Sequence, residues 1–332
     1  MDTMHVLQTI WFFIIGFLFV GYSVLDGFDL GIGTLLPYVA KDRRETAAVL
    51  SAIGPVWDGN EVWIITAGGA LFAAFPHVYA TVFSGFYLAI MLILFALIFR
   101  AVSLEFWSMD VRRRTLWKWS FSIGSLLPSL LFGVALGNVI AGIPLNDKME
   151  YTGDFFTLLR PFPLAVGLLG LSAILLQGCA YAILKTDGII QNKFRQAGKC
   201  IWIIFICCMA LSLVLSAVYL PGSMKNPLCW LCTAAILILQ IIYRILIDRD
   251  MDMILFITSA LSFAGLWGIA GALQYPNLVK ALEGPDFHLS IRNSSSSEMT
   301  LTVMLVIALI GMPFVLGYTV YVYKIFKGKV KL

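Results

Sequence analysis

Residues 6–25 read VLQTIWFFIIGFLFVGYSVL, a run of twenty residues without a charged side chain. A helix of about this length crosses the roughly 30 Å hydrocarbon core of a bilayer. No basic segment precedes the run and no small-residue cleavage site follows it. We therefore interpret it as a first membrane-spanning helix and not as a removable signal peptide. Similar apolar runs recur along the chain, so this stretch sets the fold class.

The composition excludes an ordinary water-soluble protein. Of the 332 residues, 60% are hydrophobic and 13% are charged, and the mean hydropathy is +0.90. A soluble domain carries about a quarter charged residues. The basic residues sit in short loops between apolar runs, so no nucleic-acid-binding surface is expected. The sequence predicts an all-α, polytopic membrane protein that forms a single integral membrane domain over residues 1–332.

Nine apolar runs are long enough to span a bilayer. The second is interrupted by Asp58, Asn60 and Glu61, and the seventh is the shortest. The expected spans cover residues 6–36, 48–75, 78–104, 118–143, 161–184, 200–220, 227–246, 253–275 and 299–324.

The loop charges predict the orientation. Loops after the first, third, fifth and seventh spans, together with the C-terminal tail, hold seventeen Lys and Arg, against five in the opposite loops. Cells retain basic loops in the cytoplasm. We expect the N-terminus outside and the C-terminus in the cytoplasm. The external loops at 144–160 and 276–298 are too short for a catalytic domain, so the function must lie within the bilayer or with a partner.

Five ionisable residues fall inside or at the ends of the first three spans: Asp26, Asp29, Asp58, Glu61 and Arg100. Each costs about 2.5–3.5 kcal/mol at the centre of a span. Counting at about 1.5 Å per residue puts Asp26, Asp29 and Arg100 near the inner boundary and Asp58 and Glu61 nearer the midplane. We expect Asp29 to pair with Arg100. Such a stepped series of carboxyl groups is typical of a proton route.

Simpler interpretations of these charges stay open. Asp26 and Arg100 can snorkel into the headgroups, and Asp29 can serve only as a cap or as the partner of Arg100. A purely structural role is least expected for Asp58, which is far from both ends of its expected span. For Glu61, the expectation of a purely structural role lies between that for Asp58 and that for Asp26 and Arg100.

Glycines flank the acidic residues, and small residues let helices approach closely in lipid. We expect them to turn the acidic faces into helix interfaces, although ordinary helix packing explains them equally well. They are Gly27, Gly31 and Gly33 in the first span and Gly54, Gly59, Gly68 and Gly69 in the second.

Cofactor ligands of the chain's own are not expected. His5, His77 and His288 lie at span ends or in a loop, so a haem held by two histidines is not predicted. Cys229 and Cys232 form a C-x-x-C without a second pair at zinc-like spacing, and we interpret them as packing residues. The other four cysteines read as small apolar residues, and no metal site is predicted.

Two local motifs resemble one family. GYSVLDGFDLG (residues 21–31) and GPVWDGNEVW (residues 54–63) are similar to the signatures of subunit II of cytochrome bd-type quinol oxidases, and residues 100–105 also fit. The motifs cover about the first 110 residues, and the nine-span layout extends the resemblance to the whole chain.

The resemblance implies a terminal oxidase in the bacterial cytoplasmic (inner) membrane that oxidises quinol and reduces O₂ to water. Haem b and haem d would belong to the partner, subunit I, which also holds the quinol-oxidising loop. Subunit II would share its arrangement of two four-helix bundles plus one peripheral helix, without a haem. A bound quinone occurs in some relatives, but the sequence identifies no pocket for it and leaves small accessory subunits open.

The resemblance also implies residue roles. Subunit II is expected to stabilise the haem site and to provide a proton path from the cytoplasm. Asp58 would be the central relay, with Asp29 and Arg100 nearer the cytoplasmic mouth. Asp26 and Glu61 share faces with Asp29 and Asp58 and complete the expected path. Trp57 and Trp63 are candidates for a subunit interface or an oxygen path, although aromatic residues in spans more often serve packing.

Two other functions compete with this interpretation. Buried acids near the midplane also suit a proton-coupled secondary transporter, although no convincing internal repeat is visible. A purely architectural subunit, whose acids only tie helices together, is the third hypothesis.

Overall fold

The computed structural model describes residues 3–330, which are mostly helical. The expected domain of residues 1–332 thus extends two residues beyond the described part at each end. The helices are α1 Thr3–Val39, α2 Arg43–Ile53, α3 Trp57–Ala74, α4 Pro76–Gly85, α5 Tyr87–Met109, α6 Arg114–Ala141, α7 Pro161–Lys185, α8 Gly188–Tyr219, α9 Pro227–Leu246, α10 Asp252–Gln274 and α11 Glu298–Ile325. A small sheet pairs β1 Asn277–Val279 with β2 Leu289–Ser290, and three 3₁₀ turns cover Phe156–Leu158, Pro221–Lys225 and Pro285–Phe287.

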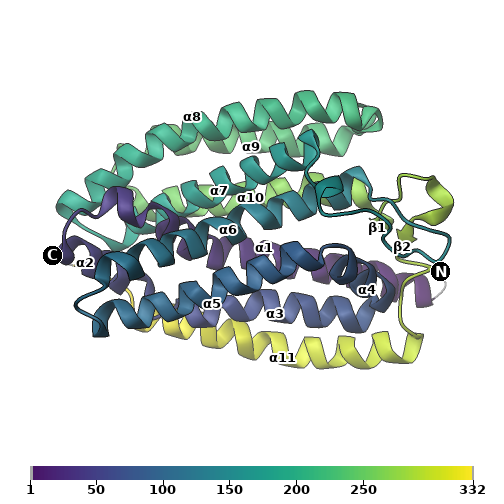
Figure 1. Ribbon diagram of the computed structural model, residues 1–332, viewed down its shortest axis with the longest axis horizontal. Coiled ribbons are helices and arrows are strands. Elements are labelled where there is room, and N and C mark those ends of the chain that lie inside the picture. Colours follow the sequence, from purple (N-terminus) through teal and green to yellow (C-terminus); the bar gives the residue numbers. More distant parts are fainter. Residues whose placement is uncertain (1–2, 331–332) are drawn as a thin grey trace.

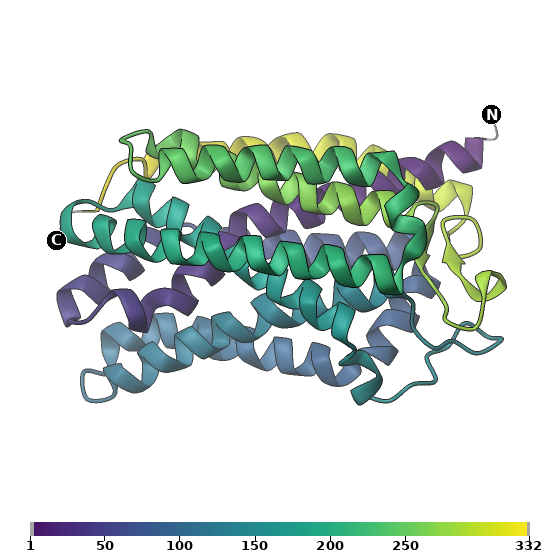
Figure 2. The same ribbon diagram turned by 90° about the horizontal axis from the view of Figure 1, so that it is seen from above.

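Within the described residues, eight helices are long and apolar enough to cross a membrane: α1 and α5 to α11. α3 runs along the same bundle between α2 at one end and α4 at the other (Figure 1). With α3 as the ninth crossing, the two chain ends lie at opposite ends of the bundle, as Figures 1 and 2 show. The all-α, polytopic prediction is confirmed.

Two expected spans are broken. The second divides into α2 and α3 at Gly54–Val56, because Pro55 lacks the N–H that a continuous helix needs. The third divides into α4 and α5 at Phe86. The sixth begins twelve residues earlier than expected, at Gly188, since the first turns of α8 are polar and escape a hydropathy criterion.

α1 lies at the centre of the molecule and packs against α3, α6, α7 and α10. One four-helix bundle consists of α1, α3, α5 and α6, and the other of α7 to α10, while α11 lies on the outside against α1 and α3 (Figure 1). The expected two bundles and peripheral helix are present. The chain's central helix is therefore the one that carries Asp26 and Asp29.

At the end of the bundle that holds α2, Lys193 of α8 pairs with Glu45 of α2 at 2.5 Å. Desolvation alone would raise the pKa of the Glu45 carboxyl, but hydrogen bonds from Lys193 and from the backbone N–H of Lys41 outweigh it and lower the pKa. This pair ties the second bundle to the short helix that precedes α3.

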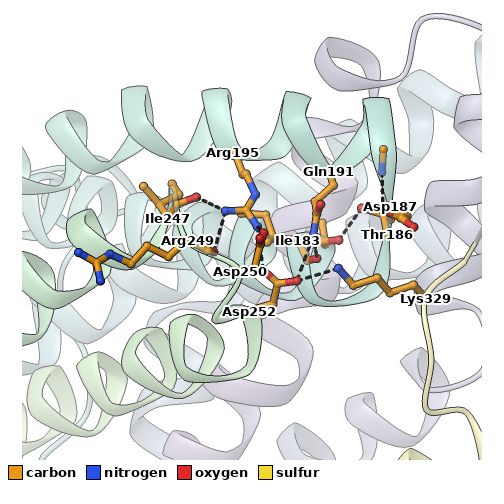
Figure 3. Close-up of polar contacts among 12 residues, drawn as sticks. Ile183, Thr186, Asp187, Gln191, Arg195, Ile247, Arg249, Asp250, Asp252 and Lys329 are labelled. Carbon is orange, nitrogen blue, oxygen red and sulfur yellow. Dashed lines mark hydrogen bonds and ion pairs between the residues drawn. The ribbon is translucent and has the colours of Figure 1, made fainter.

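A larger polar cluster fastens the C-terminal segment at the same end (Figure 3). The Asp252 carboxylate accepts hydrogen bonds from Arg195 at 2.9 Å, from Gln191 at 3.0 Å and from Lys329 at 2.7 Å. The backbone N–H of Val330 adds a bond to the Lys185 carbonyl at 2.7 Å. The first residue of α10 thus joins α8 to the segment that follows α11.

Replacing Asp252 with Ala should destabilise this end of the molecule. The change leaves the Arg195 guanidinium, 10% exposed, without its buried partner, and breaking a buried pair costs on the order of 3 kcal/mol. Thermal unfolding of the purified complex in detergent should show a lower midpoint. Asp250→Ala is the matched control, because Asp250 contacts the same guanidinium at 3.3 Å but is fully exposed. Equal shifts for the two variants would contradict this account.

Candidate functional site

The candidate site begins on α1, where residues 26–37 are all buried. Close contact with α7 explains this burial: a Cβ added at Gly31 would lie 2.2 Å from the Ile174 carbonyl oxygen, and one at Gly33 would lie 2.1 Å from the Ser125 hydroxyl of α6. Small residues thus bring α6 and α7 against α1 and keep lipid away from its acidic face.

Arg100 of α5 is the centre of the ionic cluster. Its guanidinium is 1% exposed, donates to Asp26 Oδ1 at 3.0 Å and forms a second ion pair with Glu61 of α3. The Phe121 ring lies 5.9 Å from the guanidinium carbon, and a Cβ at Gly124 would lie 3.0 Å from the Arg100 amide nitrogen. One cation therefore connects α1, α3 and α5 beneath α6.

Asp29 has a different partner. Its Oδ2 accepts a 2.7 Å hydrogen bond from Nδ2 of Asn60, which also donates to the Leu25 carbonyl at 3.2 Å. Oδ1 of Asn60 accepts in turn from the Tyr323 hydroxyl at 3.0 Å. Asp29 is thus linked through α3 to the peripheral helix α11.

Each buried acid keeps one oxygen without a hydrogen-bond partner among the described residues: Oδ2 of Asp26 and Oδ1 of Asp29. The Tyr22 hydroxyl, one turn before Asp26, is buried without a partner as well. A carboxyl oxygen that is not held by a donor is the one on which a proton can be taken up and released. The cluster therefore contains both ion-paired groups and carboxyl oxygens that can take up and release a proton.

Asp58 is on the outside of the chain. It lies in the first turn of α3, is exposed, and forms no ion pair among the described residues. It shares a face of α3 with Glu61, three residues further on, whose side chain is 17% exposed. The acidic residues thus run from the interior of the bundle to the surface of α3.

The structure corrects the expected depths and pairing. Arg100 pairs with Asp26 and Glu61, so the predicted ion pair with Asp29 is wrong. Glu61 and Asp26 both contact the Arg100 guanidinium, so they lie at a similar depth along the bundle and not at the two different depths that were expected. The prediction erred because α1 continues ten residues past Asp29 to Val39. Snorkelling is also wrong for Asp26 and Arg100, which are 0% and 1% exposed.

The expected glycine packing holds only in part. Gly31 and Gly33 lie in tight helix contacts, and a Cβ at Gly27 would make an ordinary contact at 3.8 Å. In contrast, a Cβ at Gly59, Gly68 or Gly69 would meet nothing within 4 Å. The glycines of α3 therefore do not pack inside this chain.

Trp63 lies inside the molecule, 6% exposed. Its ring fills the space beside Gly21, where an added Cβ would lie 2.2 Å from the ring. Trp57, the first residue of α3, is half-buried. Their assignment to an interface or an oxygen path stays a prediction.

Asn60 and Tyr323 are site residues that sequence reasoning did not identify. Asn60 gave a signal, since an amide inside an apolar span needs hydrogen-bond partners. Tyr323 gave none, because a tyrosine near the end of a span is common at a membrane interface.

The histidines lie away from the cluster. His5 and His77 belong to α1 and α4 near the N-terminal end of the bundle (Figure 1), and Nδ1 of His288 accepts from the Ala281 amide in the loop between the strands. In residues 3–330 no group of three or more His, Cys, Asp or Glu is placed to hold a metal ion. Cys229 and Cys232 are free thiols.

A separate cavity of about 190 Å³ lies between α6 and the second bundle. Its lining is mostly apolar and includes Trp267, Phe162 and Gly170. Two of its hydroxyls, on Ser212 and Ser223, are buried without a hydrogen-bond partner among the described residues. The cavity thus offers an apolar space with unpaired polar groups at its wall.

Comparisons with known proteins agree over nearly the whole chain. The family described as cytochrome bd terminal oxidase subunit II matches residues 7–326. Cytochrome bd-I ubiquinol oxidase subunit 2 of Escherichia coli (strain K12) is 33% identical over 355 residues, covering 96% of this chain and 94% of that protein. Cytochrome bd ubiquinol oxidase subunit 2 of Bacillus subtilis (strain 168) is 30% identical over 332 residues, covering 98% and 97%.

A solved structure shares the fold. A chain of the bd oxidase from Geobacillus thermodenitrificans superimposes with a TM-score of 0.81 over 97% of this chain and 98% of that one, at 16% identity. The family match confirms the resemblance carried by residues 21–31 and 54–63 and favours an oxidase subunit over a proton-coupled transporter. The chain belongs to the cytochrome bd terminal oxidase subunit II family, and is a multi-pass membrane subunit of a respiratory quinol oxidase.

Proposed function

We propose that this chain is the haem-free subunit of its oxidase, stabilising the haem-bearing subunit I and conducting protons from the cytoplasm toward the site where O₂ is reduced to water. The observation that carries the proposal is the series of ionisable groups that extends from the buried interior to exposed Asp58. Asp26, Arg100 and Glu61 are in direct contact, and Asp58 lies on the same helix face as Glu61.

The exposed face of α3 supports a docking role. A carboxylate facing lipid would be costly, so the surface around Asp58 requires a cover other than acyl chains. Val62 and Ile65 on the same surface are 48% and 71% exposed, and Gly59 and Gly69 leave room for a closely packed helix. A transmembrane helix of subunit I is the occupant that fits this face, and Asp58 would then lie at the subunit boundary.

The haems belong to subunit I under this proposal, where they supply electron transfer and oxygen reduction. The three histidines of this chain lie in or near the loops at the N-terminal end of the bundle, away from the Arg100 cluster. This chain's residues hold and pass protons, while Asp58 delivers them to the partner.

Asp58→Asn tests the proton path. The amide keeps the size of the side chain but does not carry a proton at neutral pH, so turnover with saturating quinol should fall about tenfold or more. Oxygen consumption by the purified complex measures this. The haem bands in the reduced-minus-oxidised spectrum should stay normal.

Asp147→Asn is the control for this variant, because Asp147 is an exposed acid in a loop at the opposite end of the bundle. Wild-type turnover in Asp58→Asn would refute the relay and support the architectural hypothesis. Loss of haem d in Asp58→Asn would mean that the residue stabilises the partner and conducts nothing.

The proposed direction requires an external N-terminus and a cytoplasmic C-terminus, which the seventeen-to-five distribution of Lys and Arg supports. A green fluorescent protein fused to the C-terminus should fluoresce in cells, and alkaline phosphatase fused there should stay inactive. Fusions after Asp147 should give the opposite pattern. A reversed result would place the acidic cluster nearer the outer surface and exclude proton entry from the cytoplasm by this route.

The cavity beside α7 fits a bound quinone. Its apolar wall suits an isoprenoid chain and ring, and the unpaired hydroxyls of Ser212 and Ser223 can donate to quinone carbonyl oxygens. This quinone would stabilise the subunit, since the cavity is separate from the Arg100 cluster.

Gly170→Leu should exclude this quinone. Gly170 lines the cavity, and a Cβ added there would make only an ordinary contact with the Gly133 Cα, at 3.6 Å, so we expect a larger side chain to occupy cavity space. Quinone extracted from the purified complex and quantified by chromatography should fall by about one equivalent per complex. The control Gly311→Leu adds the same side chain on α11, where an added Cβ meets nothing within 4 Å. Unchanged quinone in Gly170→Leu would contradict the assignment.

A further inference from the structure

The peripheral helix α11 is mostly exposed, and only Leu301 near its start is fully buried. Its inward side near the other end consists of Val322 and Tyr323, which pack against the core. The segment after the helix is held by Lys329 through Asp252 (Figure 3). α11 is therefore fixed at both ends and brings one tyrosine toward the acidic cluster.

The Tyr323 side chain is held in one position. Its ring lies edge-on to Phe28 of α1, with centroids 6.5 Å apart, and its hydroxyl donates to Oδ1 of Asn60 at 3.0 Å. Two other tyrosines of the same helix, Tyr318 and Tyr321, are 66% and 62% exposed. Of these three, Tyr323 alone reaches the site.

Three contacts set the direction of the Asn60 amide: the Tyr323 hydroxyl holds its acceptor end, and the Asp29 carboxylate and the Leu25 carbonyl hold its donor end. An amide has an acceptor end and a donor end. With Oδ1 occupied by the Tyr323 hydroxyl, Nδ2 is directed to Oδ2 of Asp29 at 2.7 Å and to the Leu25 carbonyl at 3.2 Å. Without that donor, Oδ1 of Asn60 loses the partner that the structure gives it, and the amide facing Asp29 is held at its donor end alone.

The orientation of Asn60 then selects one oxygen of Asp29. Oδ2 is an acceptor for Nδ2, so a proton bound by Asp29 resides on Oδ1, the oxygen without a partner among the described residues. At Asp26, Arg100 likewise occupies Oδ1. Asp29 thus has one defined oxygen, Oδ1, available for proton exchange.

We propose that Tyr323 is a positioning residue for the Asp29 carboxyl and acts through the amide of Asn60. The proposal rests on the proposed proton path and adds to it a control from the peripheral helix. Tyr323 itself carries no proton in this scheme. It keeps the exchangeable oxygen of Asp29 in the orientation in which protons pass.

A double-mutant cycle tests this coupling in the purified oxidase complex. Tyr323→Phe removes only the hydroxyl and should lower kcat about two- to tenfold, the effect of one lost hydrogen bond. The KM for quinol and the haem spectrum should not change, which separates positioning from a general structural defect. Tyr318→Phe, a matched change on the exposed side of α11, should behave as wild type.

Asn60→Leu should also lower kcat. On that background, Tyr323→Phe should cause no further loss, because the residue through which it acts is gone. If Asn60→Leu does not assemble with its partner, Asn60→Ser provides the background, since Ser does not reproduce the two-ended amide.

Asp29→Asn separates failure of the positioning from failure of the path. Impaired Asp29→Asn together with wild-type kcat in Tyr323→Phe would overturn the positioning role and leave the path intact. Full additivity of Tyr323→Phe and Asn60→Leu would also overturn it. Wild-type turnover in Asp29→Asn would exclude Asp29 from the path and overturn its positioning by Tyr323, whereas Asp58→Asn tests the path itself.

Discussion

The structure depends on one buried guanidinium. Arg100 is 1% exposed and contacts Asp26 and Glu61, so a single cation satisfies two carboxyl groups on two other helices. Removing one member of such a buried group costs about 3–5 kcal/mol, because the remaining charge is left without compensation. The pair with Glu61 also links α3 to α5. These ion pairs thus align α1, α3 and α5 along their axes, which apolar contacts alone would not do specifically.

Close helix contacts make this cluster sustainable in a bilayer. Gly31 on α1 lies against α7, and Gly124 on α6 lies against the backbone of Arg100. Both contacts exclude lipid from the polar groups, and Trp63 fills the groove beside Gly21. The cost of placing acids inside spans is therefore met by backbone approach as well as by ion pairing.

The surface of α3 departs from this pattern. Its glycines and Asp58 face outward, although Asp26, Asp29 and Arg100 are enclosed by the chain itself. These three buried residues have polar partners within the chain, whereas no element of the described residues covers the outer surface of α3 around Asp58. This arrangement is expected of one subunit in an assembly. α11, in contrast, belongs to the chain through its two ends and through Tyr323, whose bond to Asn60 reaches the interior.

The sequence by itself determined the all-α, multi-pass membrane architecture and the family, because apolar length and two local motifs are properties of consecutive residues. It also singled out Asp26, Asp29, Asp58, Glu61 and Arg100, since charges are conspicuous in apolar runs. Only the tertiary structure decided that Arg100 pairs with Asp26 and Glu61, that Asn60 binds Asp29 and that Asp58 faces outward. Those contacts depend on the register between separate helices and on the breaks at Gly54–Val56 and Phe86, which set the depth and rotation of each segment. Counting residues from a span boundary cannot fix that register, because α1 extends past its acids to Val39 and the helices meet at points set by glycine contacts.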